Sequence, residues 1–331
     1  MSEPVLYQPV LSATNVQVRF DGGRVRAVDT VSLEVGRGQV VALVGESGCG
    51  KTTFIRSIIG LEPLSAGHVR VAGVEVGGGA KALRSVRRVA QIVFQDPTGA
   101  LNPRHSVYEA IAEGLRIHRV PGDEAALVAG ALSSAGLRPP ERFMTRFPPE
   151  LSGGQRQRVL IAAAMALRPA LILADEPVAS LDASIRGEIL ALMRHYVDTD
   201  GVSIVAVTHD LGLAWNIADR VAVMYLGRIV EVGPTEAVLG EPRHPYTRAL
   251  LSVVPEVKGM TPEILVGETP DPRRIASGCR FHQRCPLVAN GEAERLGILD
   301  HCRGVDLELG EVQPGHSVAC HAVPARIPPP A

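Results

Sequence analysis

Several features that would place a protein in a large functional class are missing from this chain. Its 331 residues carry a formal net charge of −1, so bulk electrostatics give no reason to expect a nucleic-acid partner. The longest apolar run, Val159 to Leu167, is far shorter than the ~20 residues that cross a bilayer. Met1 to Gln8 carries no basic segment and leads into no apolar signal core. We therefore expect a soluble protein of the cytoplasm.

Lysine and cysteine are scarce, and both occur at informative places. Only three of the 34 basic residues are lysines, and one of them, Lys51, lies in a glycine-rich loop where a compact positive charge is needed. Of the five cysteines, Cys49 lies in the same loop and the other four all follow residue 278. Such a cluster indicates a metal site before it indicates disulfides. Hydrophobic residues make up 46% of the chain and charged residues 21%, which allows a sizeable core in one large domain or two modest ones.

The residues from Gly45 to Thr52 match the phosphate-loop pattern of Gly, four residues, Gly-Lys and then Ser or Thr. A buried strand is expected at 40–44 and a helix at 52–60, and this context favours a phosphate loop over a simple helix-capping turn. Glycines allow the backbone N–H groups to turn toward one anion, and the start of the helix adds partial positive charge. Lys51 is expected to reach the β- and γ-phosphates, and the Thr52 hydroxyl to bind Mg²⁺. The residues expected to contact a nucleoside triphosphate are Gly45, Glu46, Ser47, Gly48, Cys49, Gly50, Lys51, Thr52 and Thr53.

The order of the other elements predicts an α/β fold with a strand-rich N-terminal part, a parallel-sheet core and an inserted helical subdomain. The early strands are expected at 15–20, 25–35, 68–76 (as a hairpin) and 89–94. Apolar residues then recur at helical spacing from Gln95 to about Gly136, where Ser106 and Glu109 match a capping box. Strands at 171–174 and 203–207 alternate with helices, which predicts a parallel sheet with ligand groups at the carboxyl ends of its strands.

Regular patterns fade beyond Gly233, and the tail is rich in proline. We expect this tail to form a small Cys-rich lobe with little core of its own. The predicted domains are a nucleotide-binding domain over residues 1–240, with its helical insert at about 97–150, and a C-terminal extension over 241–331.

Polar residues follow three of the expected strands. Asp175 and Glu176 follow strand 171–174, where Asp175 would hold Mg²⁺ and Glu176 would orient or deprotonate the attacking water. His209 follows strand 203–207 and could contact a γ-phosphate, and Gln95 follows strand 89–94 and could reach the metal or the water. Each has an ordinary alternative, since Asp-Glu-Pro can cap a helix and a strand-end His is often a polar rim residue. Together with the phosphate loop they predict a hydrolytic site.

These motifs, in this order, resemble the ATPase subunits of ABC transporters over roughly residues 12–255. The phosphate loop resembles Walker A, Leu171 to Glu176 resembles Walker B, and Gln95 and His209 resemble the Q-loop glutamine and the switch histidine. The resemblance implies that Phe20 is the aromatic residue that stacks on adenine, and that Asp182, in Ser180-Leu181-Asp182, belongs to the D-loop.

The most specific motif is Leu151-Ser152-Gly153-Gly154-Gln155, which matches the family signature letter for letter. Ser152 and the N–H groups of Gly153 and Gly154 begin a helix and can form a second anion site. In the family this site faces the phosphate loop of the opposite subunit, so that ATP is held between two subunits.

A narrower resemblance points to the oligopeptide/dipeptide (and nickel) importer branch. It rests on Gln95-Asp96-Pro97, on Ala100-Leu101-Asn102-Pro103-Arg104, and on His244-Pro245-Tyr246-Thr247-Arg248-Ala249-Leu250-Leu251. The branch often carries a C-terminal cysteine pattern that Cys279, Cys285, Cys302 and Cys320 match, except that sixteen residues separate Cys285 from Cys302. Four thiolates suit an iron–sulfur cluster or zinc, and the resemblance favours a 4Fe–4S cluster. Zinc and the absence of any metal remain open, because the long spacing departs from the pattern.

The resemblance implies a subunit that hydrolyses ATP, with Mg²⁺, to energise the import of peptides or a related small solute. It further implies a peripheral position on the cytoplasmic side of the membrane, two membrane-spanning permease subunits and an external solute-binding protein. A second ATPase subunit is also implied; a heterodimer is favoured over a homodimer. The alternative, a soluble ABC ATPase of DNA repair or translation, is disfavoured because the chain has one cassette and no sustained heptads.

Overall fold

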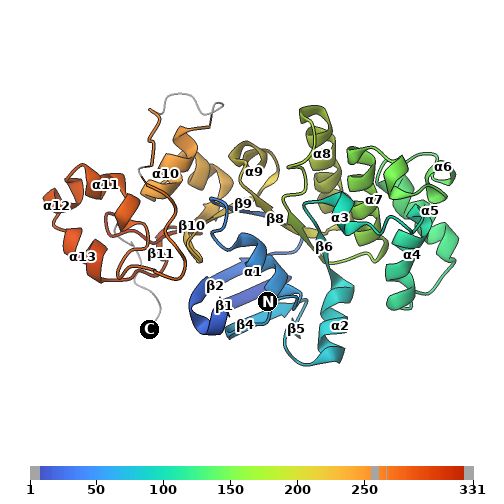
Figure 1. Ribbon diagram of the computed structural model, residues 1–331, viewed down its shortest axis with the longest axis horizontal. Helices are drawn as coiled ribbons and strands as arrows, with labels where there is room; N and C mark the ends of the chain where they lie inside the picture. The colour runs from blue at the N-terminus through green and yellow to red at the C-terminus, as the bar shows by residue number, and fades with distance from the viewer. Residues whose placement is uncertain (1–7, 255–260, 266, 324–331) are drawn as a thin grey trace, which may run out of the picture.

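The structure is a computed structural model that describes residues 8–254, 261–265 and 267–323 (Figure 1). Two sheets organise it: a four-stranded antiparallel sheet in the order β2-β1-β4-β5, and an eight-stranded sheet in the order β11-β12-β10-β9-β3-β8-β7-β6. The strands are β1 Leu11–Phe20, β2 Val25–Val35, β3 Val40–Val44, β4 Ala66–Val71, β5 Val74–Glu75, β6 Ala90–Val93, β7 Leu171–Asp175, β8 Ser203–Thr208, β9 Arg220–Tyr225, β10 Arg228–Pro234, β11 Gly310–Gln313 and β12 His316–Val318.

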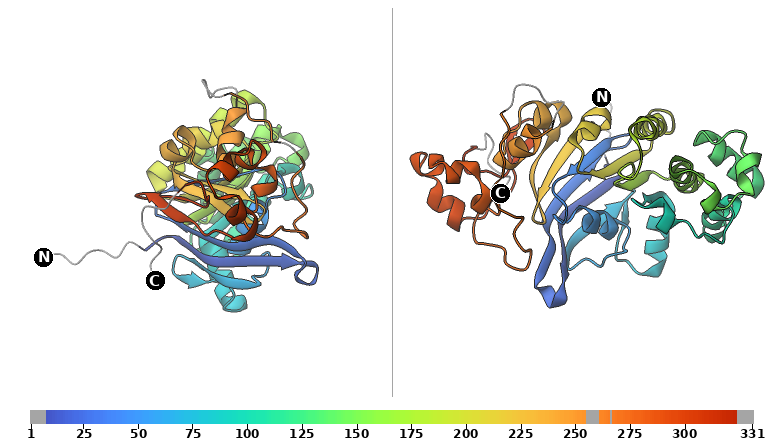
Figure 2. Two further views of the ribbon diagram at one scale, coloured as in Figure 1. Left: turned by 90° about the vertical axis from the view of Figure 1, so that its left-hand side faces the viewer. Right: turned by 45° about the horizontal axis from the view of Figure 1, so that its top comes forward.

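Helices cover the larger sheet and extend beyond both of its ends (Figures 1 and 2). They are α1 Lys51–Ile58, α2 Ala80–Val89, α3 Pro97–Ala100, α4 Val107–Ile117, α5 Glu124–Ser134, α6 Glu141–Met144, α7 Gly153–Ala166, α8 Ala183–Asp200, α9 Leu211–Ile217, α10 Pro245–Ser252, α11 Pro286–Ala289, α12 Glu292–Arg295 and α13 Leu299–Gly304. Short helical turns are η1 Asp21–Gly23, η2 Pro148–Glu150, η3 Glu236–Gly240 and η4 His282–Arg284. Among the described residues, none of the helices is both long and apolar enough to cross a membrane.

The centre of the larger sheet is parallel. β3 pairs in parallel with β8 and β9, and β7 pairs in parallel with β6 and β8. Every residue of β3, β7 and β8 is buried, as expected for parallel strands that helices cover on both faces. The predicted parallel core is therefore confirmed, and the carboxyl ends of β3, β6, β7 and β8 lie at one edge of the sheet.

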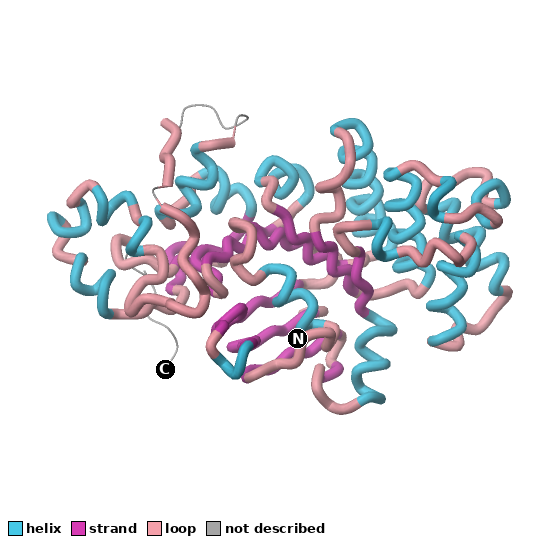
Figure 3. Tube along the Cα trace, in the orientation of Figure 1, coloured by secondary structure: helices cyan, strands magenta, loops and turns pink. Residues whose placement is uncertain are grey.

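Helix α1 lies between the two sheets (Figure 3). Phe54, Ile55 and Ile58 are fully buried, and they share one core with strand residues of both sheets, such as Val16 of β1 and Leu43 of β3. The apolar side of this helix therefore faces the core. The helix that begins at the phosphate loop is thus fixed on both sides.

The helical part is built on α7. Helices α4 and α5 both pack on α7, so the helical group extends past the predicted 97–150. The predicted capping box is present: the Ser106 Oγ accepts from the Glu109 N–H, and the Glu109 carboxylate accepts from the Ser106 N–H. Helix α2 was not predicted, and it occupies the residues just before the expected strand 89–94, which begins at Ala90.

The expectation that the tail has little regular structure is wrong for the described residues. Beyond Gly233 the tail forms α10 to α13 and the strands β11 and β12, and β12 pairs with β10 through Glu231–Val318 and Val232–Ser317. β9 and β10, which come just before the tail and continue the larger sheet, were not predicted either. Phe281 and Cys285 are buried in a core that they share with β9 and α10. A separate Cys-rich lobe is not shown, because the tail takes part in the main sheet.

Candidate nucleotide site

The phosphate loop connects β3 to α1 and passes close to two neighbouring backbone segments. Gly45 has a φ of 151° and Gly50 a φ of 111°. A Cβ atom added to Gly45 would lie 2.2 Å from the Met224 carbonyl oxygen, and one added to Gly50 would lie 2.1 Å from the Ala27 carbonyl oxygen. No residue with a side chain fits at either place unless the backbone moves. These two glycines are therefore required by the shape of the loop itself.

Lys51 is folded back into the loop. Its Nζ donates to the carbonyl oxygens of Gly45 (2.7 Å) and Glu46 (2.9 Å), and the residue is only 5% exposed. Neutral carbonyls hold this cation without cancelling its charge. Phosphate oxygens can replace them as acceptors and add a charge interaction, so the position suits the predicted role of Lys51.

The Thr52 hydroxyl donates to Asp175 Oδ1 at 2.9 Å, which joins the start of α1 to the end of β7. Burial raises the pKa of Asp175, although the hydrogen bond from Thr52 and the nearby positive charges of Arg56 and Lys51 oppose this shift. A buried carboxylate and a hydroxyl side by side are oxygen ligands of the kind that Mg²⁺ prefers. The pair therefore fits the predicted magnesium ligands.

Glu176 lies between two polar side chains from the neighbouring strands. Gln95 Nε2 donates to Glu176 Oε2 at 3.1 Å, and His209 Nδ1 lies 3.2 Å from Glu176 Oε1. The three residues follow β6, β7 and β8, so the parallel sheet brings them together from distant parts of the sequence. Their convergence was predicted; their individual roles remain predictions.

A cavity of about 600 Å³ opens beside these groups. Its lining includes the phosphate loop from Ser47 to Thr53, together with Gln95, Glu176 and His209. The sequence analysis missed part of the wall, namely Val25, Arg26, Ala27, Leu226, Gly227 and Pro272. Phe20 is not among the lining residues, but it pairs with Val25 across the β1–β2 hairpin. Its stacking on adenine therefore stays a prediction for a residue at the rim.

Comparison with known proteins identifies the family. The family described as ABC transporter matches residues 28–179, and the one described as oligopeptide/dipeptide transporter, C-terminal region, matches residues 230–291. A putative peptide import ATP-binding protein of Brucella abortus (strain 2308) is 43% identical over 310 residues, which cover 92% of this chain and 89% of the relative. A probable peptide ABC transporter ATP-binding protein of Sinorhizobium fredii is 42% identical over 316 residues, covering 93% and 84%. The chain belongs to the ABC transporter ATP-binding proteins.

Solved structures of ABC ATPases share its fold. The cbiO1 protein of Clostridium perfringens, part of the ABC transporter complex cbiONQ, matches 70% of this chain and 91% of its own with a TM-score of 0.64 at 28% identity. An ATP-binding cassette solved as a dimer in a post-hydrolysis state, bound to ADP and Pi, matches 68% and 98% with a TM-score of 0.62 at 29% identity. The predicted ABC ATPase fold is confirmed, and the alternative of a non-transport ABC ATPase is not favoured.

The family signature lies outside the nucleotide cavity. Ser152 caps α7 through a capping box with Gln155: the Ser152 Oγ accepts from the Gln155 N–H (3.2 Å), and the Ser152 N–H donates to Gln155 Oε1 (3.1 Å). Asp182 caps α8 by accepting from the Ile185 N–H at 3.1 Å. Neither Ser152, Gly153, Gly154, Gln155 nor Asp182 lines the cavity formed by this chain's own phosphate loop. Their predicted contact with ATP therefore requires a second subunit.

The four C-terminal cysteines line one small apolar cavity, although sixteen residues separate Cys285 from Cys302. Burial raises the pKa of Cys279 to about 12 and that of Cys320 to about 11, so these thiols need a nearby cation to ionise. Soft thiol donors around one cavity suit iron or zinc. However, no three His, Cys, Asp or Glu side chains of the described residues are grouped closely enough to hold a metal ion. The predicted cluster is therefore not supported by the geometry of the thiols.

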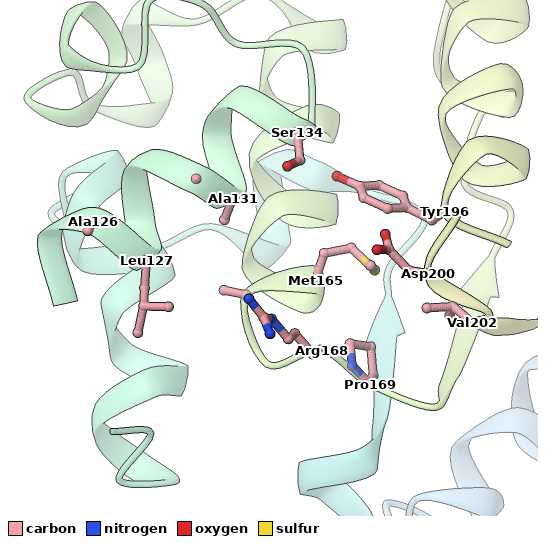
Figure 4. Close-up of a pocket in the computed structure, with 12 residues that line it drawn as sticks. Ala126, Leu127, Ala131, Ser134, Met165, Arg168, Pro169, Tyr196, Asp200 and Val202 are labelled. Atoms are coloured by element: carbon pink, nitrogen blue, oxygen red, sulfur yellow. The ribbon is translucent and has the colours of Figure 1, made fainter. Parts of the chain in front are cut away.

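A second hollow, of about 520 Å³, lies between α5, the end of α7 and α8 (Figure 4). Its lining includes Arg168, Pro169, Tyr196, Asp200 and Val202. Pro169 and Val202 come just before β7 and β8, so this hollow lies at the amino ends of the parallel strands. The phosphate loop and Glu176 lie at the opposite edge, where ligands bind in sheets of this kind. The hollow is thus separate from the nucleotide site.

Proposed function

We propose that this chain is the ATP-hydrolysing subunit that energises the import of peptides, or of a related small solute, through an ABC transporter. The convergence of Gln95, Glu176 and His209 beside the phosphate loop carries the proposal for hydrolysis. The match of residues 230–291 to the C-terminal region of oligopeptide/dipeptide transporters supports peptides as the cargo. We take residues 1–240 as the ATP-binding part and 241–331 as the transporter-specific extension.

The chemistry assigned to the site follows from its polar groups. Lys51 and the N–H groups of the loop bind the β- and γ-phosphates, and Thr52, Asp175 and Gln95 hold Mg²⁺, which neutralises charge that develops on the phosphates. Glu176 orients the attacking water and accepts its proton. His209 contacts the γ-phosphate from the other side of Glu176. The position of Glu176 between Gln95 and His209 supports this arrangement.

The partners follow from the family. We propose two membrane-spanning permease subunits, a second ATPase subunit (different from this one rather than identical) and a solute-binding protein on the outer side. The chain would then lie on the cytoplasmic face of the membrane. Helices α4 to α6 are the proposed docking surface for a permease, with Gln95 at the hinge. The exposed Phe147 beside η2 offers an apolar contact there.

Transport assays test the proposal. The complex, purified with its permease subunits and placed in lipid vesicles, should accumulate labelled peptide only when ATP is present on the side of this subunit. Replacing this subunit by its Lys51→Ala variant should abolish uptake, because the variant lacks the cation that binds the phosphates. ATP hydrolysis without any permease partner, and without peptide uptake, would instead favour a non-transport ATPase.

We also propose that Cys279, Cys285, Cys302 and Cys320 bind one 4Fe–4S cluster, with zinc as the alternative. The four thiols line one cavity although they are not grouped closely enough to hold a metal as they stand; a bound metal would draw them together and supply the charge that these buried thiols need to ionise. Protein purified without oxygen should be brown and contain about four irons per chain. Colourless protein with one zinc per chain would assign zinc, and protein with neither metal would rule out the site.

A further inference from the structure

Two arginines lie between the first two cysteines of the C-terminal extension. Arg280 and Arg284 follow Cys279 and precede Cys285, and their side chains are only 4% and 8% exposed. A buried guanidinium is costly unless it is paired. Their ion-pair partners, Asp29 and Glu46, both lie outside the extension, and Glu46 belongs to the phosphate loop.

Arg284 binds the phosphate loop directly. Its Nη1 donates to Glu46 Oε2 at 2.7 Å and its Nη2 to Glu46 Oε1 at 3.0 Å. Glu46 is the residue after Gly45, at the start of the loop, and its own carbonyl oxygen accepts from Lys51. A pair of parallel hydrogen bonds fixes the orientation of a carboxylate as well as its position. Arg284 therefore restrains the loop beside the lysine that binds the phosphates.

Two more contacts tie Glu46 to the same extension. Thr269 Oγ1 donates to Glu46 Oε2 at 3.0 Å, and the backbone N–H of Glu46 donates to Tyr246 Oη at 2.9 Å. Tyr246 is fully buried and packs against the Phe281 ring, with the ring centroids 5.3 Å apart. Within the described chain, every hydrogen-bond partner of the Glu46 carboxylate thus comes from residues after 241.

Arg280 binds segments that lie beside the phosphate loop. It forms an ion pair with Asp29 of β2 and donates to the carbonyl oxygen of Leu226, which lines the nucleotide cavity. The Asp29 N–H donates to the Gly227 carbonyl (2.9 Å), and the Gly227 N–H donates to the Cys49 carbonyl (2.8 Å). A continuous series of hydrogen bonds therefore runs from Arg280 to the phosphate loop.

The charge of Glu46 explains why these contacts matter for ATP binding. Burial alone would raise the pKa of Glu46, but the hydrogen bonds and the positive charge of Arg284 outweigh it and lower this pKa. An ionised carboxylate in a phosphate loop repels the phosphates of ATP. The guanidinium cancels this repulsion and holds the carboxylate toward the extension.

We propose that Arg284 is a positioning residue for ATP binding. It holds Glu46, and with it the phosphate loop, in the shape that receives the phosphates, and it neutralises a charge that opposes them. The C-terminal extension is then a working part of the nucleotide site. This inference rests on the binding of ATP at the phosphate loop, as proposed above.

Titration of the full-length chain with a fluorescent ATP analogue and Mg²⁺ tests the proposal. Arg284→Gln should raise the Kd and the KM for ATP about tenfold and leave kcat within about twofold, since the residue acts on binding. Arg284→Lys keeps the charge but not the paired hydrogen bonds, so its Kd for ATP is expected to rise about threefold. This variant replaces Arg284→Gln in the test if the Gln variant fails to fold. Arg248→Gln, which removes a partly exposed ion pair to Glu263 in the same extension, is the control and should match the wild type.

A double variant separates this role from general damage. In a Glu46→Ala background the Arg284→Gln change should alter the Kd less than about twofold, because its partner is gone. An unchanged Kd for Arg284→Gln, or an equal loss in both backgrounds, would overturn the proposal. A wild-type chain that binds no ATP would instead overturn the proposed function, and this inference with it.

Discussion

At the scale of single residues, the backbone of Glu176 is as informative as its side chain. Its φ is 45°, a left-handed conformation that residues with side chains adopt at some cost. The Glu176 N–H donates to the Val207 carbonyl oxygen of β8 at 3.0 Å, which helps to hold this conformation. The turn directs the carboxylate between Gln95 and His209, where it is 19% exposed. The unusual backbone conformation at this position is therefore coupled to the placement of the carboxylate between Gln95 and His209.

The first prediction concerns the chemistry of Glu176. The Glu176→Gln variant should bind ATP normally and hydrolyse it about 10²–10⁴-fold more slowly, because the amide cannot accept the proton of the attacking water. Turnover in the assembled transporter, together with ATP binding to the isolated chain, measures the two effects separately. Glu34→Gln, an exposed position on β2, is the matched control. Near-normal hydrolysis by Glu176→Gln would remove Glu176 from the proposed role.

Residue patterns predicted the polar groups of the site but not its whole wall. Gln95, Glu176 and His209 could be placed because each directly follows an apolar strand, and parallel strands end at one edge. Leu226 and Gly227 sit in the turn between two strands that the sequence analysis did not predict, and Pro272 comes from the irregular tail. Such residues carry no chemical signal of their own. Only the path of the chain brings them to the cavity.

At the scale of elements, Glu231 joins the ATP-binding part to the extension. It lies on β10, is fully buried, and accepts from the backbone N–H groups of Arg243 (2.8 Å) and His244 (3.0 Å). The His316 Nε2 of β12 lies 2.9 Å from Glu231 Oε1. One carboxylate thus accepts hydrogen bonds from the segment that precedes α10 and also contacts β12, the strand that extends the sheet. The tail is therefore held by β10, the strand that follows the turn at Leu226 and Gly227 beside the nucleotide cavity.

The second prediction follows from this burial. Glu231→Ala should lower the free energy of unfolding by about 3–5 kcal/mol, because it leaves buried N–H groups and His316 without their acceptor. The midpoint of guanidinium-induced unfolding, followed by circular dichroism, measures the loss. Glu241→Ala removes a carboxylate that is 75% exposed and should change stability by less than about 0.5 kcal/mol. Equal midpoints for the two variants would contradict this view of Glu231.

Among the elements, α4 was predicted from its sequence, whereas α2 and the short strands β11 and β12 were missed. α4 and its capping box follow from apolar spacing and from Ser106 with Glu109. α2 has Leu83, Val86 and Val89 at helical spacing, but only Val86 is buried and basic residues occupy its other sides; the sequence analysis did not predict it. The short strand β12 is stabilised by pairing with β10, and β11 pairs in turn with β12. Pairing with a strand some 80 residues earlier leaves no local mark in the sequence.

At the scale of the whole molecule, the phosphate loop and the family signature lie apart, and the proposed function treats them as parts of two different ATP sites. The phosphate loop, Glu176 and His209 surround the cavity, whereas Ser152 and its glycines begin α7 outside it. The free N–H groups at the start of a helix suit an anion. A second ATPase subunit can supply its own signature to this cavity and receive ATP from its own loop at Ser152.

The third prediction tests this exchange. A chain with Ser152→Ala should bind ATP in its own phosphate loop but support little hydrolysis. If the protein forms homodimers, mixing it with a Lys51→Ala chain should restore activity, since one of the two interfaces then carries neither lesion. In a heterodimer, Ser152→Ala should impair the site on the partner's loop. The absence of rescue in a homodimer, or of any effect across the interface in a heterodimer, would argue against a shared site.

The segment between Cys285 and Cys302 affects how relatives of this protein can be recognised from their sequences. Helices α11 to α13 carry the chain outward and back, so that the Cys279 N–H donates to the Cys302 carbonyl oxygen at 2.9 Å. The outer part of this segment, from Glu294 to Gly297, is exposed. The match to the peptide-transporter C-terminal region stops before it, at residue 291. A change in the length of this exposed segment would leave the four cysteines in place around one cavity. A search for this cysteine pattern that fixes the interval between its second and third members will overlook proteins with such a change.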